Sequence, residues 1–327
     1  MRRDRLLEAP PNAGRGRGEG ALASVAVTSD EKFPQAGLVA GILTYVLWGF
    51  LPLAFKFVTH VPTVTVVADR TVWTLLLVGG ILVVAGRTAE IRAALADWRS
   101  LRSMLISATL LCSNWLIYVW AIESGQVLET SFGYFINPLV NIMLGVVLLG
   151  ERLNRVQMFS IGMAAVAIGI QAIGLSGIPV IALTLALSFA AYGYFRKTAK
   201  VSSTTGLFVE TLLIVPLAIG YLAFTFIRDG GVGPHADPQT LLLLMLTGPA
   251  TAVPLLLFAF AVQRLKLTTV GMLQYIAPSI AFLLAIYAFH EPLNELRLFS
   301  FALIWLSLII FTVDTVVRRR AASPLKL

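Results

Sequence analysis

Ten apolar stretches follow one another along the chain and leave few folds open to it. A helix of roughly 20 residues spans the hydrocarbon core of a bilayer. Inside lipid every backbone N–H and C=O must be bonded within the protein, and the alternation typical of barrel strands is absent. The sequence therefore predicts an all-α integral membrane protein with ten transmembrane helices, at 36–57, 63–85, 103–122, 128–149, 156–174, 177–196, 206–227, 240–262, 268–289 and 297–317.

The distribution of charge predicts how these helices face. Only 13% of the residues are charged, against about 25% in an ordinary soluble domain. If the N-terminus is inside, 21 of the 25 Lys and Arg residues fall on the inner side, as the positive-inside rule requires. We therefore expect a multi-pass protein of the bacterial inner (plasma) membrane with both termini cytoplasmic. The net charge of +8 then reflects topology, so nucleic-acid binding is not expected.

An internal repeat divides the chain. Residues 131–160 align without a gap with residues 271–300, and eight of the thirty positions are identical. Each half holds five predicted helices, an odd number, so the two halves must be inverted relative to each other. The expected domains are a disordered basic cytoplasmic tail at 1–34, which lacks the apolar run of a signal peptide, repeat 1 at 35–175, repeat 2 at 176–318, and a cytoplasmic tail at 319–327. Inverted repeats are typical of alternating-access transporters.

Charged residues inside the predicted helices mark candidate gates. Such groups are costly in a bilayer, so each is a functional hypothesis, although those near helix ends can also extend to water. Arg70 lies deepest and needs a partner, for which Asp69 and Glu129 are the alternatives. The gate or ion-coupling candidates are Lys56, Asp69, Arg70 and Glu129 toward the outer side, and Arg196, Lys197 and Glu210 toward the inner side.

Polar and aromatic residues within the helices predict a cavity for a small solute. Asn114 and Tyr118 lie one turn apart on one helix face, although aromatic residues can equally be interfacial anchors. The cavity candidates are Trp48, Arg70, Asn114, Tyr118, Glu129, Tyr134, Asn137, Tyr192, Gln274 and Tyr275. His60, His235 and His290 are far apart in sequence and no catalytic motif is present, so no catalytic residue, metal or cofactor is expected. A membrane-embedded enzyme is disfavoured, and a non-transporting scaffold remains an alternative.

Several motifs together resemble a known family. They are WG…P…K from Trp48 to Lys56, NW..YVWA from Asn114 to Ala121, ETSFGYFINPLVNIMLG from Glu129 to Gly145, SFAAYG..RK from Ser188 to Lys197, and QYI.P from Gln274 to Pro278. The chain resembles the EamA-type permeases of the drug/metabolite transporter superfamily, and among these the RarD (chloramphenicol-sensitive protein) family. That family typically has His-Arg where this chain has Asp69-Arg70, so a histidine proton relay at that position is disfavoured.

The resemblance implies secondary transport of a small metabolite or drug-like solute across the inner membrane. With the repeat, it predicts alternating access without a prosthetic group, coupled to a proton or other ion gradient. Arg70 is expected to anchor the solute or gate, and Glu129 to be its counter-charge and proton carrier. The expected partners are the solute and the lipid bilayer, a homodimer is left open, and the sequence does not identify the solute, the direction of transport or the coupling ion.

Overall fold

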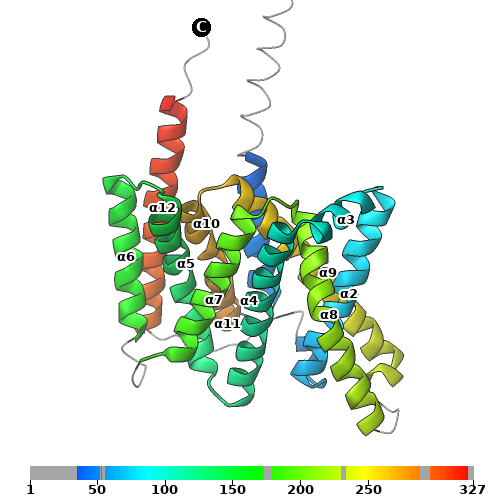
Figure 1. The fold of residues 1–327 in the computed structure, drawn as a ribbon. Coiled ribbons are helices and arrows are strands. Elements are labelled where there is room, and N and C mark those ends of the chain that lie inside the picture. The colour runs from blue at the N-terminus through cyan, green and yellow to red at the C-terminus, as the bar shows by residue number, and fades with distance from the viewer. Residues whose placement is uncertain are drawn as a thin grey trace, which may run out of the picture.

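A computed structural model describes residues 35–51, 53, 56–172, 178–229, 233–287 and 295–322, and this part of the chain is helical with no strand. After a first helix, Gln35–Leu51, the elements are η1 (Lys56–Val58), α2 (Thr63–Val84), α3 (Thr88–Ala96), α4 (Trp98–Glu123), α5 (Val127–Leu149), α6 (Arg155–Ala172), α7 (Val180–Thr198), α8 (Ser203–Arg228), η2 (Pro234–Ala236), α9 (Pro238–Arg264), α10 (Leu267–Gln274), α11 (Ile276–Tyr287) and α12 (Glu295–Ala322) (Figure 1). The predicted tail at 1–34 and residues 323–327 lie outside the described residues.

Eight of the ten predicted membrane spans are long and apolar enough in the structure to cross a bilayer. They are α2, α4, α5, α6, α8, α9, the α10–α11 segment and α12. The first helix has 17 described residues, and α7, which ends in Arg196 and Lys197, is not among the eight. The all-α membrane fold is therefore confirmed, whereas the count of ten spans is not.

Helix starts recur along the chain at one constant offset, the same offset that relates 131–160 to 271–300 in the sequence. The matched pairs are α2 and α8, which begin at 63 and 203, α4 and α9, at 98 and 238, α5 and α10, at 127 and 267, and α6 and α12, at 155 and 295. Local signals set some of these starts. Ser202 caps α8 through the N–H of Thr205, and Asp237 caps α9 through the N–H of Thr240, with Pro238 in the first turn.

Matched helices run in opposite directions, which is the geometry of an inverted repeat. The clearest case is α6 and α12. Asn154, just before α6, donates to Asp314 near the end of α12 at 2.6 Å, and Gln171 near the end of α6 donates to Ser300 near the start of α12 at 3.0 Å. Two further bonds join pairs of positions that the repeat exchanges, and α12 donates both: Ser300 donates to the carbonyl of Ala167, and Ser307 to that of Ser160, each at 2.7 Å.

The helices pack into two groups that meet near one end of the bundle (Figure 1). One group contains α2, α3, α8 and α9, and the other contains α4, α5, α6, α7 and α12. Tyr192 of α7 and Phe258 of α9 lie in the buried core that joins them. We call the end where α3 lies and where α7 and α9 finish the basic end, because it carries Arg87, Lys197 and Arg264.

The prolines of the two repeats act differently. Pro138 lies inside the continuous helix α5, whereas the matching helix is divided at Tyr275, three residues before Pro278. A proline cannot donate to the carbonyl four residues earlier, so a break near it is expected. The helices α5 and α10 cross closely, because a Cβ built at Gly271 would lie 2.7 Å from the carbonyl oxygen of Pro138. Between these two matched helices, a break near the proline is thus seen only in the second repeat.

Candidate functional site

A fully buried ion pair links the two groups of helices at the basic end. Arg196 of α7 and Glu210 of α8 are both 0% exposed, with Nη1 3.5 Å from Oε1. The guanidinium also donates to the carbonyl of Ser203 at 2.9 Å. The hydroxyl of Tyr192 donates to Glu210 Oε2 at 3.4 Å, and Ser107 of α4 donates to Oε1. The predicted cluster of Arg196 and Glu210 is therefore one network that also contains Tyr192 and joins α4, α7 and α8.

Gly206 makes room for this network. A Cβ built at Gly206 would lie 1.9 Å from Arg196 Nη1 and 2.8 Å from Cζ, so the guanidinium occupies the space that a side chain would fill. Burying a charge is unfavourable unless its partners are close and its geometry is held. Glycine at this position of α8 is thus part of the ion-pair site, although its sequence context gives no sign of it.

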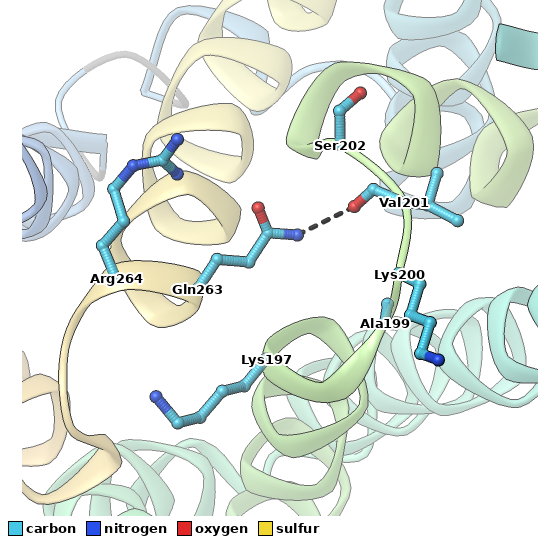
Figure 2. A pocket seen from close by; sticks show the side chains of 7 residues that line it. All are labelled: Lys197, Ala199, Lys200, Val201, Ser202, Gln263 and Arg264. Carbon is cyan, nitrogen blue, oxygen red and sulfur yellow. Dashed lines mark hydrogen bonds between the residues drawn. The ribbon is translucent and has the colours of Figure 1, made fainter. Parts of the chain in front are cut away.

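Lys197 closes the neighbouring space between α7 and α9. Its ammonium donates to the carbonyls of Val262, at 3.1 Å, and Leu265. Gln263 donates to the carbonyl of Val201 at 2.9 Å, as Figure 2 shows. A cavity of about 480 Å³ lies beside these contacts and is lined by Lys197, Ala199, Lys200, Val201, Ser202, Gln263 and Arg264 (Figure 2). Lys197 thus joins α7 to α9 at the edge of a basic cavity.

A second carboxylate holds the N-terminus of α10. Gly150 ends α5 in the left-handed conformation, with φ of 64°. Next to it, Glu151 accepts the backbone N–H groups of Leu267 at 2.6 Å and Thr268 at 2.9 Å. Free N–H groups and the helix dipole make a helix N-terminus favourable for a carboxylate. Repeat 1 therefore caps a helix of repeat 2 at the basic end, through a residue that was not among the predicted site residues.

Glu90 of α3 makes a third link at this end. Its carboxylate pairs with Arg87 at 2.6 Å and accepts the hydroxyl of Thr205 at 2.8 Å. The hydroxyl of Ser202 lies 3.2 Å away. The hydrogen bond from Arg87, followed by that from Thr205, lowers the pKa of Glu90 to about 2. The start of α8 in repeat 2 is thereby fixed to α3 in repeat 1.

Asp69 at the opposite end pairs with a histidine. Its side chain is 5% exposed, and His235 Nε2 in η2 lies 2.9 Å from Oδ2 and 3.1 Å from Oδ1. Nearby, His60 contacts the hydroxyl of Thr240 at 3.0 Å. The sequence suggested Asp69 as one alternative partner for Arg70, but in the structure Asp69 is hydrogen-bonded to His235. The Asp69–His235 pair was not foreseen, because the two residues are distant in sequence.

Arg70 lies among aromatic side chains. Its guanidinium carbon is 3.9 Å from the ring centroid of Trp115 on α4, and its buried Nε has no hydrogen-bond partner among the residues that the structure describes. Tyr118 and Tyr134 are close enough to interact electrostatically with it. Their rings meet edge-on with centroids 6.0 Å apart. The structure thus brings the predicted residues Arg70, Tyr118 and Tyr134 together, and adds Trp115.

Other predicted cavity residues form contacts between helices. Asn114 donates to the carbonyl of Leu185 and to the hydroxyl of Ser188 on α7, each at 2.9 Å. Trp48 packs against Phe189 and Phe258 with ring centroids 5.6 and 5.7 Å apart. Tyr192 stacks on Phe258 at 5.8 Å. Trp48 and Tyr192 thus lie in the contact zone between the two groups of helices, whereas Asn114 joins α4 to α7 within one group.

A cluster of amides lies where α5 crosses α10. Asn141 donates to Gln274 at 2.7 Å and to Asn137 at 3.4 Å, and all three are nearly or fully buried. Tyr275 is also fully buried, and its hydroxyl makes no hydrogen bond. Asn141 was not predicted, although its position one turn after Asn137 places both on one helix face. Neither the side chain of Lys56 nor that of Glu129 is described, so the roles predicted for them stay predictions.

Together these features define a multi-pass helical membrane protein built from two related halves, with polar links between the halves. A family model described as the EamA-like transporter family matches residues 35–172 and again residues 176–313. The chain belongs to the EamA-like transporter family.

Named relatives support the same assignment. A Vibrio cholerae protein named "Uncharacterized transporter" is 38% identical over 298 residues, which cover 90% of this chain and 98% of the relative. "Protein RarD" of Escherichia coli is 35% identical over 295 residues, covering 90% and 99%. The predicted resemblance to RarD is thereby confirmed. A solved structure titled "Crystal structure of protein" has a TM-score of 0.66 at 19% identity, covering 88% of this chain and 99% of that one, and shows the fold alone.

Proposed function

We propose that this protein is a secondary active transporter that moves a small metabolite or drug-like solute by alternating access. The observation that carries the proposal is the inverted repeat, in which matched helices such as α6 and α12 run antiparallel. Two halves related in this way can exchange conformations, so that a central site opens first to one side and then to the other. The transporter family supports this class, and argues against the enzyme and scaffold alternatives.

The links at the basic end are proposed to be one gate. The Arg196–Glu210–Ser107 network and the contacts of Lys197 with α9 hold the two groups of helices together there, and the cap of Glu151 holds the end of α5 to the start of α10. A solute can leave on that side only if these contacts separate. By the positive-inside rule the basic end faces the cytoplasm of a bacterial inner membrane, with both termini on that side.

The opposite end is proposed to hold the second gate and the site of ion coupling. Asp69 and His235 form a hydrogen-bonded pair there. Glu129, near the start of α5, remains the candidate counter-charge of Arg70, and Lys56 remains a candidate gate residue. A carboxylate in a dehydrated site titrates at higher pH than in water, which would suit Glu129 to carry a proton.

The experiment is transport by the purified full chain in proteoliposomes. An untargeted comparison of solutes inside and outside deletion and overexpressing cells selects the solute to be tested. The wild type is expected to accumulate that solute when a pH gradient is imposed, whereas Glu129→Gln should exchange solute without pH-driven accumulation. Undiminished pH-driven uptake by Glu129→Gln would remove this residue from coupling. Absence of any flux, with chemical turnover in detergent or a stable protein partner, would favour the enzyme or the scaffold instead.

A further inference from the structure

Arg70 differs from the other cation that lies deep in the helices. Arg196 is paired with Glu210 and with the carbonyl of Ser203. Arg70, in contrast, forms no ion pair with any carboxylate whose side chain the structure describes, and its adjacent Asp69 is taken by His235. A guanidinium in a membrane span is unfavourable, and a cation–π contact offsets only part of that cost. The stacking on Trp115 therefore leaves the charge of Arg70 only partly compensated.

The repeat sharpens this contrast. Arg70 and Glu210 occupy matched positions, because each is the eighth residue of its helix, α2 from Thr63 and α8 from Ser203. Each is followed by a threonine that bonds back to the carbonyl four residues earlier: Thr71 to Val67 and Thr211 to Leu207, both at 2.8 Å. The local helix is the same at both places, yet among the side chains that the structure describes only Glu210 has a counter-ion. The matched place in repeat 1 carries a cation whose counter-ion can come from a ligand.

The arrangement of the side chains suits a carboxylate. The guanidinium of Arg70 lies over the indole ring of Trp115, with its Cζ 3.9 Å from the ring centroid. The edge of a guanidinium presents parallel N–H groups in the spacing of the two carboxylate oxygens. The unbonded Nε of Arg70 belongs to this edge. Tyr118 and Tyr134 supply phenol hydroxyls beside it, and Tyr134 is 51% exposed. The rings of Trp115, Tyr118 and Tyr134 offer contact to an apolar or aromatic body.

We propose that Arg70, Trp115, Tyr118 and Tyr134 form a binding site for the carboxylate of an organic acid that has an aromatic or apolar body. This inference rests on the proposed transport function and names its substrate class. The carboxylate supplies for Arg70 the negative charge that Glu210 supplies for Arg196.

Binding is measured on the full chain in detergent, apart from any flux. Reaction of the single cysteine, the half-buried Cys112, with a maleimide dye on heating reports unfolding without interference from ligand absorbance. The probes are benzoate, phenylacetate and indole-3-acetate, each compared with its uncharged primary amide at equal ionic strength. A ligand that binds only the folded protein raises its unfolding temperature in proportion to the logarithm of its concentration over Kd. At least one carboxylate is expected to raise that temperature, with at least about tenfold tighter binding than its amide.

Three variants test the assignment. Arg70→Gln should lose the preference for the carboxylate. Arg70→Lys keeps the charge but not the planar edge, so it should weaken carboxylate binding at least about tenfold and remains informative if Arg70→Gln does not fold. Arg264→Gln is the matched control, because Arg264 lies over Phe260 at 3.4 Å at the basic end, and it should bind like the wild type.

Several outcomes would overturn the inference. They are stabilisation by the amides equal to that by the carboxylates, full carboxylate binding by Arg70→Lys or Arg70→Gln, and the absence of any shift with all three acids. If one of these outcomes is found and the protein still transports a neutral solute in proteoliposomes, the carboxylate site is refuted but the proposed transport function is not. Carboxylate binding that depends on Arg70 without any flux would instead support the site and refute transport.

Discussion

A methyl group added at Gly206 would act directly on the buried ion pair. The built Cβ lies 1.9 Å from Arg196 Nη1, whereas ordinary contact begins at 3.4 Å, so the guanidinium must leave this space in the Gly206→Ala variant. That displacement breaks the 2.9 Å hydrogen bond to the carbonyl of Ser203 and the 3.5 Å contact with Glu210. Both charged groups then remain buried without each other as counter-ions.

The expected loss of stability is large for a single methyl group. Breaking a buried ion pair so that a charge is left uncompensated costs about 3–5 kcal/mol. Conversion to a change in unfolding temperature, at roughly 2–4 °C per kcal/mol, gives a fall on the order of 10 °C. The measurement is the unfolding temperature of the purified protein in detergent.

Gly220→Ala is the control, because Gly220 lies in the same helix and its built Cβ has nothing within 4 Å. Alanine favours a helix over glycine by up to about 1 kcal/mol, so this variant should be unchanged or slightly stabilised. In a background carrying Arg196→Met and Glu210→Gln, the Gly206→Ala substitution should lose most of its effect. Equal unfolding temperatures for the two alanine variants, or an undiminished effect in that background, would refute the reasoning.

Three further expectations concern links between the repeats. The folded-state pKa of Glu90 is about 2, below its unfolded value of about 4.3, so its pairing with Arg87 stabilises the protein above the unfolded pKa and is lost as pH falls toward 2. The difference in unfolding temperature between the wild type and Glu90→Gln should therefore shrink as pH falls over that range. A difference that stays constant would contradict this. His235→Ala leaves the buried carboxylate of Asp69 without its partner and should lower stability by about 1–3 kcal/mol, whereas Asp69→Asn should make the same histidine substitution nearly neutral in thermal unfolding. Glu151→Gln can accept only one of the two N–H groups of α10 and should increase hydrogen exchange at the start of that helix, with no change at the start of α9.

The sequence predicted those features of the fold that depend on local pattern. Apolar length and charge predicted the helices, and α2 begins at the predicted residue 63. The offset of the sequence repeat also relates four pairs of helix starts, because duplicated segments keep their caps and apolar lengths. The grouping of Arg196 with Glu210 followed from their placement at one side of the membrane. The count of spans was less certain, because the first helix and α7 are shorter or less apolar than the rest.

Contacts between distant helices were beyond prediction. Asp69 meets His235 because α2 and α9 pack in one register, and this register depends on many small contacts and not on a motif. The space beside Gly206 that the guanidinium of Arg196 occupies can be recognised only once the position of Arg196 is known. Asn141 offered a usable signal, its spacing of one turn from Asn137, whereas the partner Gln274 depends on the crossing of α5 and α10.

The paired serine bonds between α6 and α12 have a consequence for assembly. Ser300 meets Ala167 and Ser307 meets Ser160, and the repeat exchanges these two pairs of positions, although α12 donates both bonds. The backbones of the two helices therefore meet as those of identical subunits do in an isologous dimer, where each contact between positions occurs twice. A two-fold interface of this kind is closed, since both copies of the surface are already used. The two halves of one chain thus already form the dimer-like contact. A second chain would have to associate through a surface other than the serine-bearing faces of α6 and α12.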